Sequence, residues 1–168
     1  MTRRMTWRAA GVTAGTVLVI ALAGCRQPDG SVPAPAGEQT NRVDDISRDL
    51  QNVARNDSNA PAELLDDLTY LESVPRPPAR LKELGDALTV SLRGGKLPDA
   101  EAKRVSTLVF QMVAAKDLSE SQIAQIGTDL RETLVKAGST PEAADRVASA
   151  GSALAGEVTQ NKKRWYQR

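Results

Sequence analysis

The chain has 168 residues, of which 40% are hydrophobic, 3% aromatic and 26% charged, with one cysteine and no histidine. A single cysteine cannot form an internal disulfide, and the lack of histidine excludes His-dependent catalytic triads and most zinc sites. The formal net charge of +1 is too small for the basic surface of a nucleic-acid-binding domain.

Residues 1–24 have the layout of a secretory signal peptide. Three arginines and no acid lie in residues 1–8, and an uncharged, largely apolar stretch fills residues 9–24. A membrane-spanning helix needs about 20 apolar residues, and Arg26 ends this stretch short of that length. Residues 2–8 also partly match a twin-arginine export signal, so the general secretory route and the twin-arginine route both stay open.

The signal-like segment ends in a leucine, two small residues and a cysteine, namely Leu22, Ala23, Gly24 and Cys25. This order resembles the lipobox of bacterial lipoproteins, and the resemblance covers residues 1–25 only. It implies that a diacylglyceryl group is attached to the Cys25 thiol, that the chain is cleaved before Cys25, and that the new amine is acylated. We therefore predict a bacterial lipoprotein precursor with Cys25 as the lipidation site.

Lipidation would hold the mature chain at a membrane, outside the cytoplasm. Each buried methylene adds about 0.8 kcal/mol of membrane affinity, so two or three acyl chains would make the attachment permanent. The residue after the cysteine is Arg26, whereas in lipoproteins of this kind an aspartate there favours retention in the inner membrane. The resemblance therefore favours the outer membrane, with the cell membrane as the alternative and the domain periplasmic or surface-facing.

Residues 25–40 are predicted to be the lipidated cysteine followed by a flexible tether. The segment contains several residues that interrupt helices, namely Pro28, Gly30, Pro33, Pro35 and Gly37. As a coil, residues 26–40 would span roughly 20–25 Å. That length keeps a domain near the membrane without pressing it onto the lipid.

Residues 41–168 are predicted to form one all-α domain. Strong helix formers dominate the composition, and apolar residues recur at the spacing of three and four that is typical of amphipathic helices. About six helices are expected, which begin near Val43, Pro61, Pro78, Pro98, Ser119 and Thr140. Ser119 and Gln122 have the spacing of a capping box. We expect αα-hairpins that form a small bundle or a short helical-repeat array.

Two patterns predict how these helices pack. Gly85 recurs as Gly127 and Pro98 recurs as Pro141, at offsets of 42 and 43 residues. A glycine inside a helix costs about 1 kcal/mol relative to alanine, so these glycines predict close helix crossings, and a repeated hairpin is one interpretation of the offset. Opposite charges four residues apart predict ion pairs within single helices, namely Asp44–Arg48, Asp99–Lys103, Glu132–Lys136 and Glu142–Arg146.

The carboxyl end is unusually basic and aromatic. Without residues 1–24, the chain has 19 basic and 21 acidic residues, and four of the basic residues lie in the last seven positions. We name this the basic–aromatic segment, and its candidate contact residues are Lys162, Lys163, Arg164, Trp165, Tyr166 and Arg168. Tryptophan and tyrosine favour the membrane interface, and cations bind anionic surfaces. A membrane or partner contact is one interpretation, and a helix end that complements the helix dipole is the other.

Catalytic motifs are not evident in the sequence. Asp44–Asp45 and Asp66–Asp67 are paired acids, but adjacent helix positions point about 100° apart, so we expect solvated faces rather than convergent carboxylates. Gly94–Gly95 precedes a lysine without the spacing of a phosphate-binding loop. We therefore expect no catalytic residue, no metal and no cofactor.

These patterns predict a lipid-anchored cell-envelope protein that acts as a non-enzymatic binding or scaffolding module. One alternative is a helical regulator or inhibitor of an envelope enzyme or sensor, and another is a carboxylate-dependent envelope hydrolase. The membrane is the expected partner through the N-terminal lipid, with an envelope protein as a further candidate and no nucleic acid. The sequence leaves a small-molecule ligand and the oligomeric state open.

Overall fold

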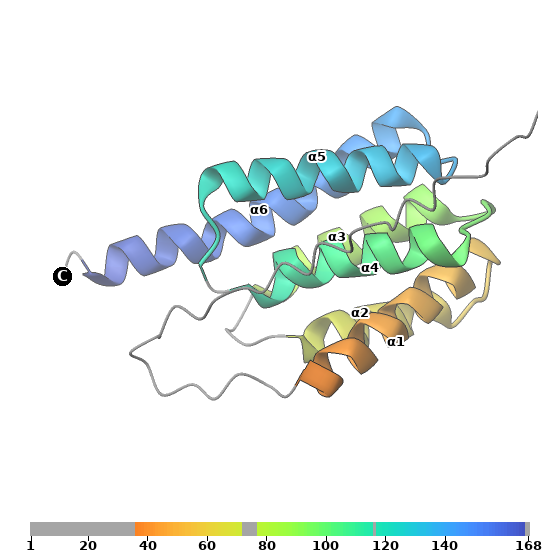
Figure 1. Cartoon of the computed structure of the whole chain (residues 1–168), viewed down its shortest axis with the longest axis horizontal. Coiled ribbons are helices and arrows are strands. Elements are labelled where there is room, and N and C mark those ends of the chain that lie inside the picture. Colours follow the sequence, from red (N-terminus) through yellow and green to blue (C-terminus); the bar gives the residue numbers. More distant parts are fainter. Residues whose placement is uncertain (1–35, 72–76, 116, 167–168) are drawn as a thin grey trace, which may run out of the picture. The chain divides into compact units, whose positions relative to one another are not determined.

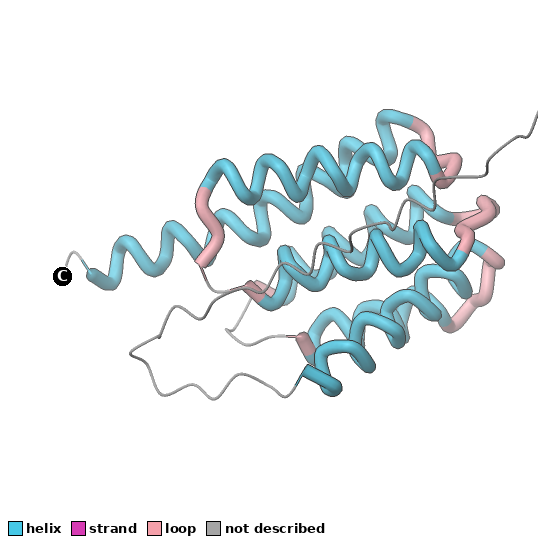
Figure 2. Tube along the Cα trace, in the orientation of Figure 1, coloured by secondary structure: helices cyan, strands magenta, loops and turns pink. Residues whose placement is uncertain are grey.

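The computed structural model describes residues 36–71, 77–115 and 117–166, with residues 36–39 and 158–166 described through the backbone alone. All regular structure in these ranges is helical, which confirms the predicted all-α class (Figure 2). The helices are α1 (Ala36–Ala54), α2 (Ala60–Tyr70), α3 (Pro78–Leu92), α4 (Asp99–Ala114), α5 (Glu120–Lys136) and α6 (Pro141–Tyr166).

Most helix ends follow from local sequence. Ser119 caps α5 in the predicted capping box, since its hydroxyl accepts from the Gln122 backbone N–H at 3.2 Å and its own N–H donates to the Gln122 side chain at 2.8 Å. Gly138, with φ of 98°, follows the end of α5 in a left-handed conformation that suits glycine. The start of α1 differs from the expectation, because the helix begins at Ala36 and includes the last five residues of the expected tether 25–40.

The six helices pack as two triplets, which are visible in Figure 1. In the first triplet α1, α2 and α3 contact one another, and in the second triplet α4, α5 and α6 do the same. The triplets meet where α1 packs on α4 and where α3 packs on α6. Helices α3 and α4 are not in close contact, unlike α5 and α6, so the described helices are not organised as the repeated hairpin that the 42-residue offset suggested.

A different internal correspondence matches the triplets. Arg42–Val43 in α1 recurs as Arg104–Val105 in α4, and Asp67–Leu68 in α2 recurs as Asp129–Leu130 in α5, both at an offset of 62 residues. The proline that begins α3 recurs at the start of α6 after 63 residues, and most buried positions of α3 correspond to buried positions of α6 at the same offset. The internal resemblance of this fold is therefore between three-helix units.

Aliphatic side chains fill the interior, and Phe110 is only partly buried. Met112 of α4 is fully buried, and its thioether lies against two glycines of the second triplet. A Cβ atom added at Gly151 in α6 would overlap the Met112 sulfur, and one added at Gly127 in α5 would lie 3.0 Å from the Ser152 hydroxyl. At Gly85 the nearest atoms to an added Cβ are leucine side-chain carbons at 3.8 and 3.9 Å, which is ordinary contact. The tight crossings therefore occur at Gly127 and Gly151.

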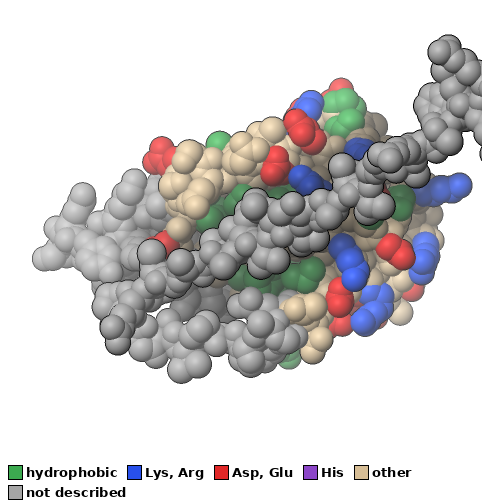
Figure 3. All heavy atoms as spheres, viewed as in Figure 1, with side chains coloured by type: hydrophobic (Ala, Val, Ile, Leu, Met, Phe, Trp, Pro, Cys, Tyr) green, Lys and Arg blue, Asp and Glu red, His purple; other side chains and the backbone are tan. Residues whose placement is uncertain are grey.

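Several surface ion pairs link neighbouring helices, in addition to pairs within α1 and α3. Asp44 of α1 pairs with Lys103 of α4 at 3.3 Å, so neither forms the pair expected within its own helix. Lys136 of α5 likewise pairs with Glu101 of α4 at 2.9 Å. Figure 3 shows basic and acidic side chains interspersed on the face that it displays. These pairs favour the observed neighbours over other arrangements of the helices.

Candidate functional site

The residues predicted from the N-terminal resemblance, Leu22 to Cys25, lie outside the described residues. The backbone of the basic–aromatic segment is described as far as Tyr166, where α6 ends. Its side chains lie outside the described set, as do both residues after Tyr166. The structure therefore shows where α6, the helix that contains this segment, lies in the bundle.

One contact shows where α6 passes α3, and a second shows where α1 begins relative to α2. The Arg80 guanidinium, near the start of α3, donates to the Glu157 carboxylate of α6 at 2.9 Å. Helix α6 therefore passes the start of α3 near Glu157 and continues for nine more residues, about 14 Å of helix. On the other side, Arg42 near the start of α1 donates to the Tyr70 carbonyl at the end of α2, at 3.0 Å.

These contacts place the start of α1 and the carboxyl end of α6 at the same end of the bundle. Helix α1 runs antiparallel to α2, and α2 runs antiparallel to α3, so α1 and α3 begin at the same end. Helix α6 runs antiparallel to α3 and ends there, and Figure 1 shows its last turns projecting beyond the other helices. We call this the terminal end of the bundle, because both chain ends of the domain lie there.

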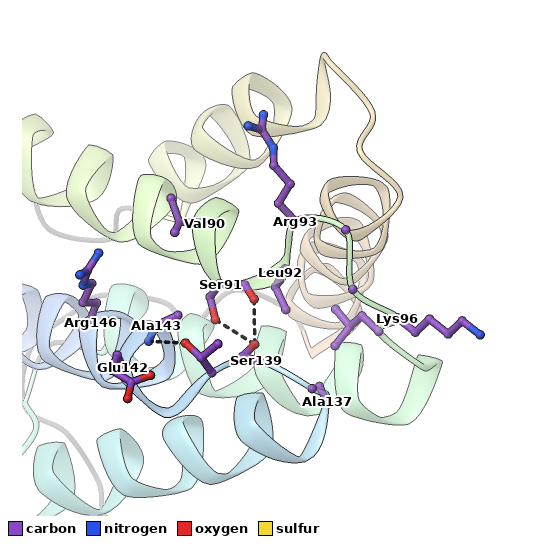
Figure 4. Close-up of a pocket in the computed structure, with 15 residues that line it drawn as sticks. Val90, Ser91, Leu92, Arg93, Lys96, Ala137, Ser139, Glu142, Ala143 and Arg146 are labelled. Atoms are coloured by element: carbon purple, nitrogen blue, oxygen red, sulfur yellow. Dashed lines mark hydrogen bonds between the residues drawn. The ribbon is translucent and has the colours of Figure 1, made fainter.

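A pocket of about 450 Å³ lies at the opposite end of the bundle. It is formed by the turn after α3, the turn between α5 and α6, and the first residues of α6 (Figure 4). The Ser139 hydroxyl donates to the Ser91 carbonyl at 2.9 Å and accepts from the Ser91 hydroxyl at 2.9 Å. Both hydroxyl groups thus take part in hydrogen bonds that join α3 to the turn before α6.

The charged residues around this pocket do not converge. Figure 4 shows the Arg93 and Lys96 side chains directed away from the two serines, and Glu142 lies beside the start of α6. The Thr140 hydroxyl accepts from the Ala143 backbone N–H at 3.2 Å and so caps α6. The hydrogen bonds of this pocket therefore join helix ends.

The paired acids of the sequence separate in the structure. Asp44 pairs with Lys103, and Asp45 pairs with Arg48 at 2.9 Å, so both have cationic partners. Asp66 is exposed, as expected for a solvated face. Asp67 is different, because it is half-buried and lies against α1.

The partner of Asp67 is Asp49 of α1, a residue that belongs to none of the sequence motifs described above. Asp49 is only 7% exposed. Burial, the Asp67 charge and a hydrogen bond with the Asp67 side chain raise the pKa of Asp49 from 3.8 to about 7. Glu63 raises this pKa further, and Arg48 lowers it. The register could have indicated the burial, because Asp49 lies three residues after Ile46 and four before Val53, both on the apolar face of α1.

A smaller pocket of about 230 Å³ lies beside this pair of acids, at the seam between α1 and α2. Its lining includes Arg42, Asp45, Asp67 and the exposed Tyr70. Asp49 does not line it, so one carboxyl group of the pair faces the pocket and the other lies behind in the helix interface.

A third depression, of about 470 Å³, follows the surface between α4 and α5. The ion pair of Glu101 with Lys136 crosses it, and the hydrogen bond from Lys136 lowers the pKa of Glu101. A carboxylate held in this way is a structural anchor between two helices.

The described ranges contain no group of three or more carboxylates or thiols placed to bind a metal ion. Within the same ranges, none of the helices combines the length and apolar character that crossing a bilayer requires. Comparison of the chain with protein-family models, with curated proteins and with solved structures found no match.

Proposed function

We propose that this protein is a lipid-anchored envelope module whose helical bundle contacts the membrane with its terminal end. The observation that carries this proposal is the position of the start of α1 and the carboxyl end of α6 at one end of the bundle. If Cys25 carries lipid, the domain is tethered through residues 26–35, directly before α1. The basic–aromatic segment then lies on the side of the bundle that faces the lipid.

The two contacts would act together. The lipid supplies attachment, and four positive charges among residues 162–168 would add attraction to an anionic surface, about 1 kcal/mol for each charge near it. By helical register, positions 162, 165 and 166 share one side of α6, which would bring a lysine, a tryptophan and a tyrosine to the interface. A bundle held at two points would keep a constant orientation toward the membrane.

In this orientation the pocket of Ser91 and Ser139 lies at the end farthest from the membrane, where an envelope partner could reach it. A non-enzymatic role is supported by the position of the described acid pair of Asp49 and Asp67. One of these carboxyl groups is buried in the helix interface, away from any substrate in the adjoining pocket. We therefore favour binding or scaffolding over hydrolysis.

Lipidation is tested by metabolic labelling with a fatty-acid analogue in a bacterial host. The wild-type chain should incorporate label and the Cys25→Ser chain should not, because the sequence has no other cysteine. Equal labelling of the two proteins would contradict the anchor.

The orientation is tested on the lipidated protein in vesicles that contain brominated acyl chains, which quench nearby tryptophan. Trp165 is the one tryptophan left after residues 1–24 are removed, so its fluorescence reports on the basic–aromatic segment. We expect quenching in anionic vesicles that weakens as salt screens the charges.

Two charge-matched variants separate orientation from net charge. Glutamine at Lys162, Lys163 and Arg164 should reduce quenching, whereas glutamine at Arg93, Lys96 and Arg146, at the far end of the bundle, should leave it unchanged. Quenching that is absent from the wild type, or lost equally in both variants, would contradict the proposed orientation.

A further inference from the structure

The seam between α1 and α2 differs from the other described helix interfaces that polar side chains bridge. Where α1 meets α4, and where α4 meets α5, a cation pairs with a carboxylate. At the seam where α1 packs on α2, the buried Asp49 carboxyl lies beside the half-buried Asp67 carboxyl, and no cation among the described residues takes the place of either. Two ionised carboxylates in contact repel each other, so this contact is favourable only when one of them is protonated.

Burial makes the arrangement depend on that proton. Asp49 is 7% exposed, so water cannot solvate a negative charge there as it does for the exposed Asp66. Buried carboxylates are normally balanced by a cation or by several donors. The other charge of α2 that acts on Asp49 is Glu63, which is also acidic.

Two arginines of α1, Arg48 and Arg42, have other described partners near the pair. Arg48, on the same helix as Asp49, forms its ion pair with Asp45 at 2.9 Å and is largely exposed. Arg42 donates to the Tyr70 carbonyl at 3.0 Å. The positive charge of Arg48 stabilises an ionised Asp49 less than burial and the neighbouring acids destabilise it, which is why the pKa of Asp49 lies above the ordinary value.

The other helices that pack on α1 do not neutralise the pair either. From α4, Lys103 reaches α1 at Asp44, and Asp99 accepts from the Gln51 amide at 2.6 Å. The charged residues of α3 pair among themselves or with α6: Arg80 with Glu83 and Glu157, and Lys82 with Asp86.

We propose that Asp49 and Asp67 share one proton and act as a pH-sensitive latch between α1 and α2, closed while the proton is bound and loosened when it leaves. In the closed state the protonated carboxyl donates a hydrogen bond to the carboxylate of the other residue. Loss of the proton leaves two adjacent negative charges, with Glu63 nearby, and the helix hairpin is pushed apart. Because α1 directly follows residues 26–35, the latch would act on the part of the bundle next to the tether.

The direction of the pH effect follows from proton linkage. The pKa of Asp49 is about 7 in the folded protein and has an ordinary value of 3.8, so the folded state holds this proton more tightly than the unfolded chain does. The bound proton stabilises the folded state fully when the pH is below 3.8. This stabilisation decreases as the pH rises from 3.8 toward 7, and it is lost above about pH 7.

Thermal unfolding of the full chain in mild detergent, followed by circular dichroism from pH 5 to pH 8, tests the latch. The melting temperature of the wild type should fall by at least about 5 °C over this range and then level off. Asp49→Asn should remove most of the fall, and Asp67→Asn should shift it to lower pH, because the new amide can donate to an ionised Asp49. Asp66→Asn, an exposed neighbour of Asp67, is the matched control and should keep the wild-type fall.

Two measurements on the wild type keep the test decisive if a variant fails to fold. Infrared spectroscopy should show a protonated carboxyl group at pH 6 that titrates near neutral pH. Hydrogen exchange, corrected for intrinsic rates, should show that α1 and α2 lose protection between pH 6 and pH 8 while α5 and the first turns of α6 do not. A wild-type melting temperature that does not change with pH, a fall that persists in Asp49→Asn, or the absence of the protonated carboxyl band would overturn the latch.

Discussion

Replacing Gly151 by alanine tests whether Met112 is held between two glycines. In an ordinary helix interior this change gains about 1 kcal/mol of stability, because alanine has the higher helix propensity. At position 151 the new methyl group would overlap the Met112 sulfur. Overpacking of this kind costs typically about 1–3 kcal/mol.

The overlap is costly because Met112 has little room to move. A methionine side chain is flexible and can often refill a space, but Met112 is fully buried. Its terminal methyl would also lie 3.9 Å from a Cβ atom at Gly127 on the other side. When the gain in helix propensity is set against the cost of overpacking, Gly151→Ala should lower the free energy of unfolding by about 0–2 kcal/mol.

Gly156→Ala is the matched control, because Gly156 lies in the same helix and an added Cβ there meets no atom within 4 Å. This variant should gain about 1 kcal/mol, so the two variants should differ by about 1–3 kcal/mol in the free energy of unfolding. Chemical denaturation followed by circular dichroism measures the difference. In a Met112→Ala background the overlap is gone, and Gly151→Ala should then stabilise like the control. Equal gains at both positions with Met112 present would refute the packing argument.

Four further predictions concern single positions. Ser119→Ala should lower the free energy of unfolding by about 1 kcal/mol through loss of the capping box, whereas Ser149→Ala on an exposed helix surface should change it little in the same denaturation assay. Leu84→Ala, in the fully buried core, should cost about 2–5 kcal/mol in that assay. Gly138→Ala should cost about 1 kcal/mol because the backbone there has positive φ. Cys25→Ser should abolish fatty-acid labelling and leave the melting temperature of the bundle unchanged.

Local sequence was sufficient to predict the helices but not how they pack. The capping box at Ser119 and the proline at position 141 mark helix starts through interactions within a few residues, so the sequence pattern identifies them. Helix α1 begins earlier than the sequence pattern predicts, because Pro35 and Gly37 do not prevent a helix from starting at Ala36. Pro35 directly precedes the first helical residue, and one glycine can be accommodated within a helix.

The sequence alone does not reveal the correspondence between the two triplets, because a large residue in one triplet can be replaced by a small residue at the equivalent position of the other. The match of Gly85 with Gly127 suggested a hairpin repeat, whereas the correspondence between the triplets pairs Leu88 of α3 with Gly151 of α6. A leucine and a glycine look unrelated in sequence. They are equivalent because both are buried on the same side of corresponding helices, and this requires the structure.

The same limit applies to the acid pair. The period of the apolar face of α1 is enough to predict that Asp49 is buried. The neighbour of Asp49 is Asp67 rather than a cation because of the way in which α2 packs on α1. The spacing of residues within a single helix does not determine that packing. The charged pairs show the same dependence, because Asp44 and Lys136 find partners on other helices.

The meeting of the two triplets also bears on how the molecule would respond to cleavage. The turn between α3 and α4 joins the triplets along the chain, and it contains the exposed residues Arg93 and Lys96. Trypsin would cut after either residue, yet each fragment would keep three mutually packed helices and its share of the interface of α1 with α4 and of α3 with α6. The fragments should therefore remain bound to each other after the backbone is broken, and separately produced halves should reassemble when mixed.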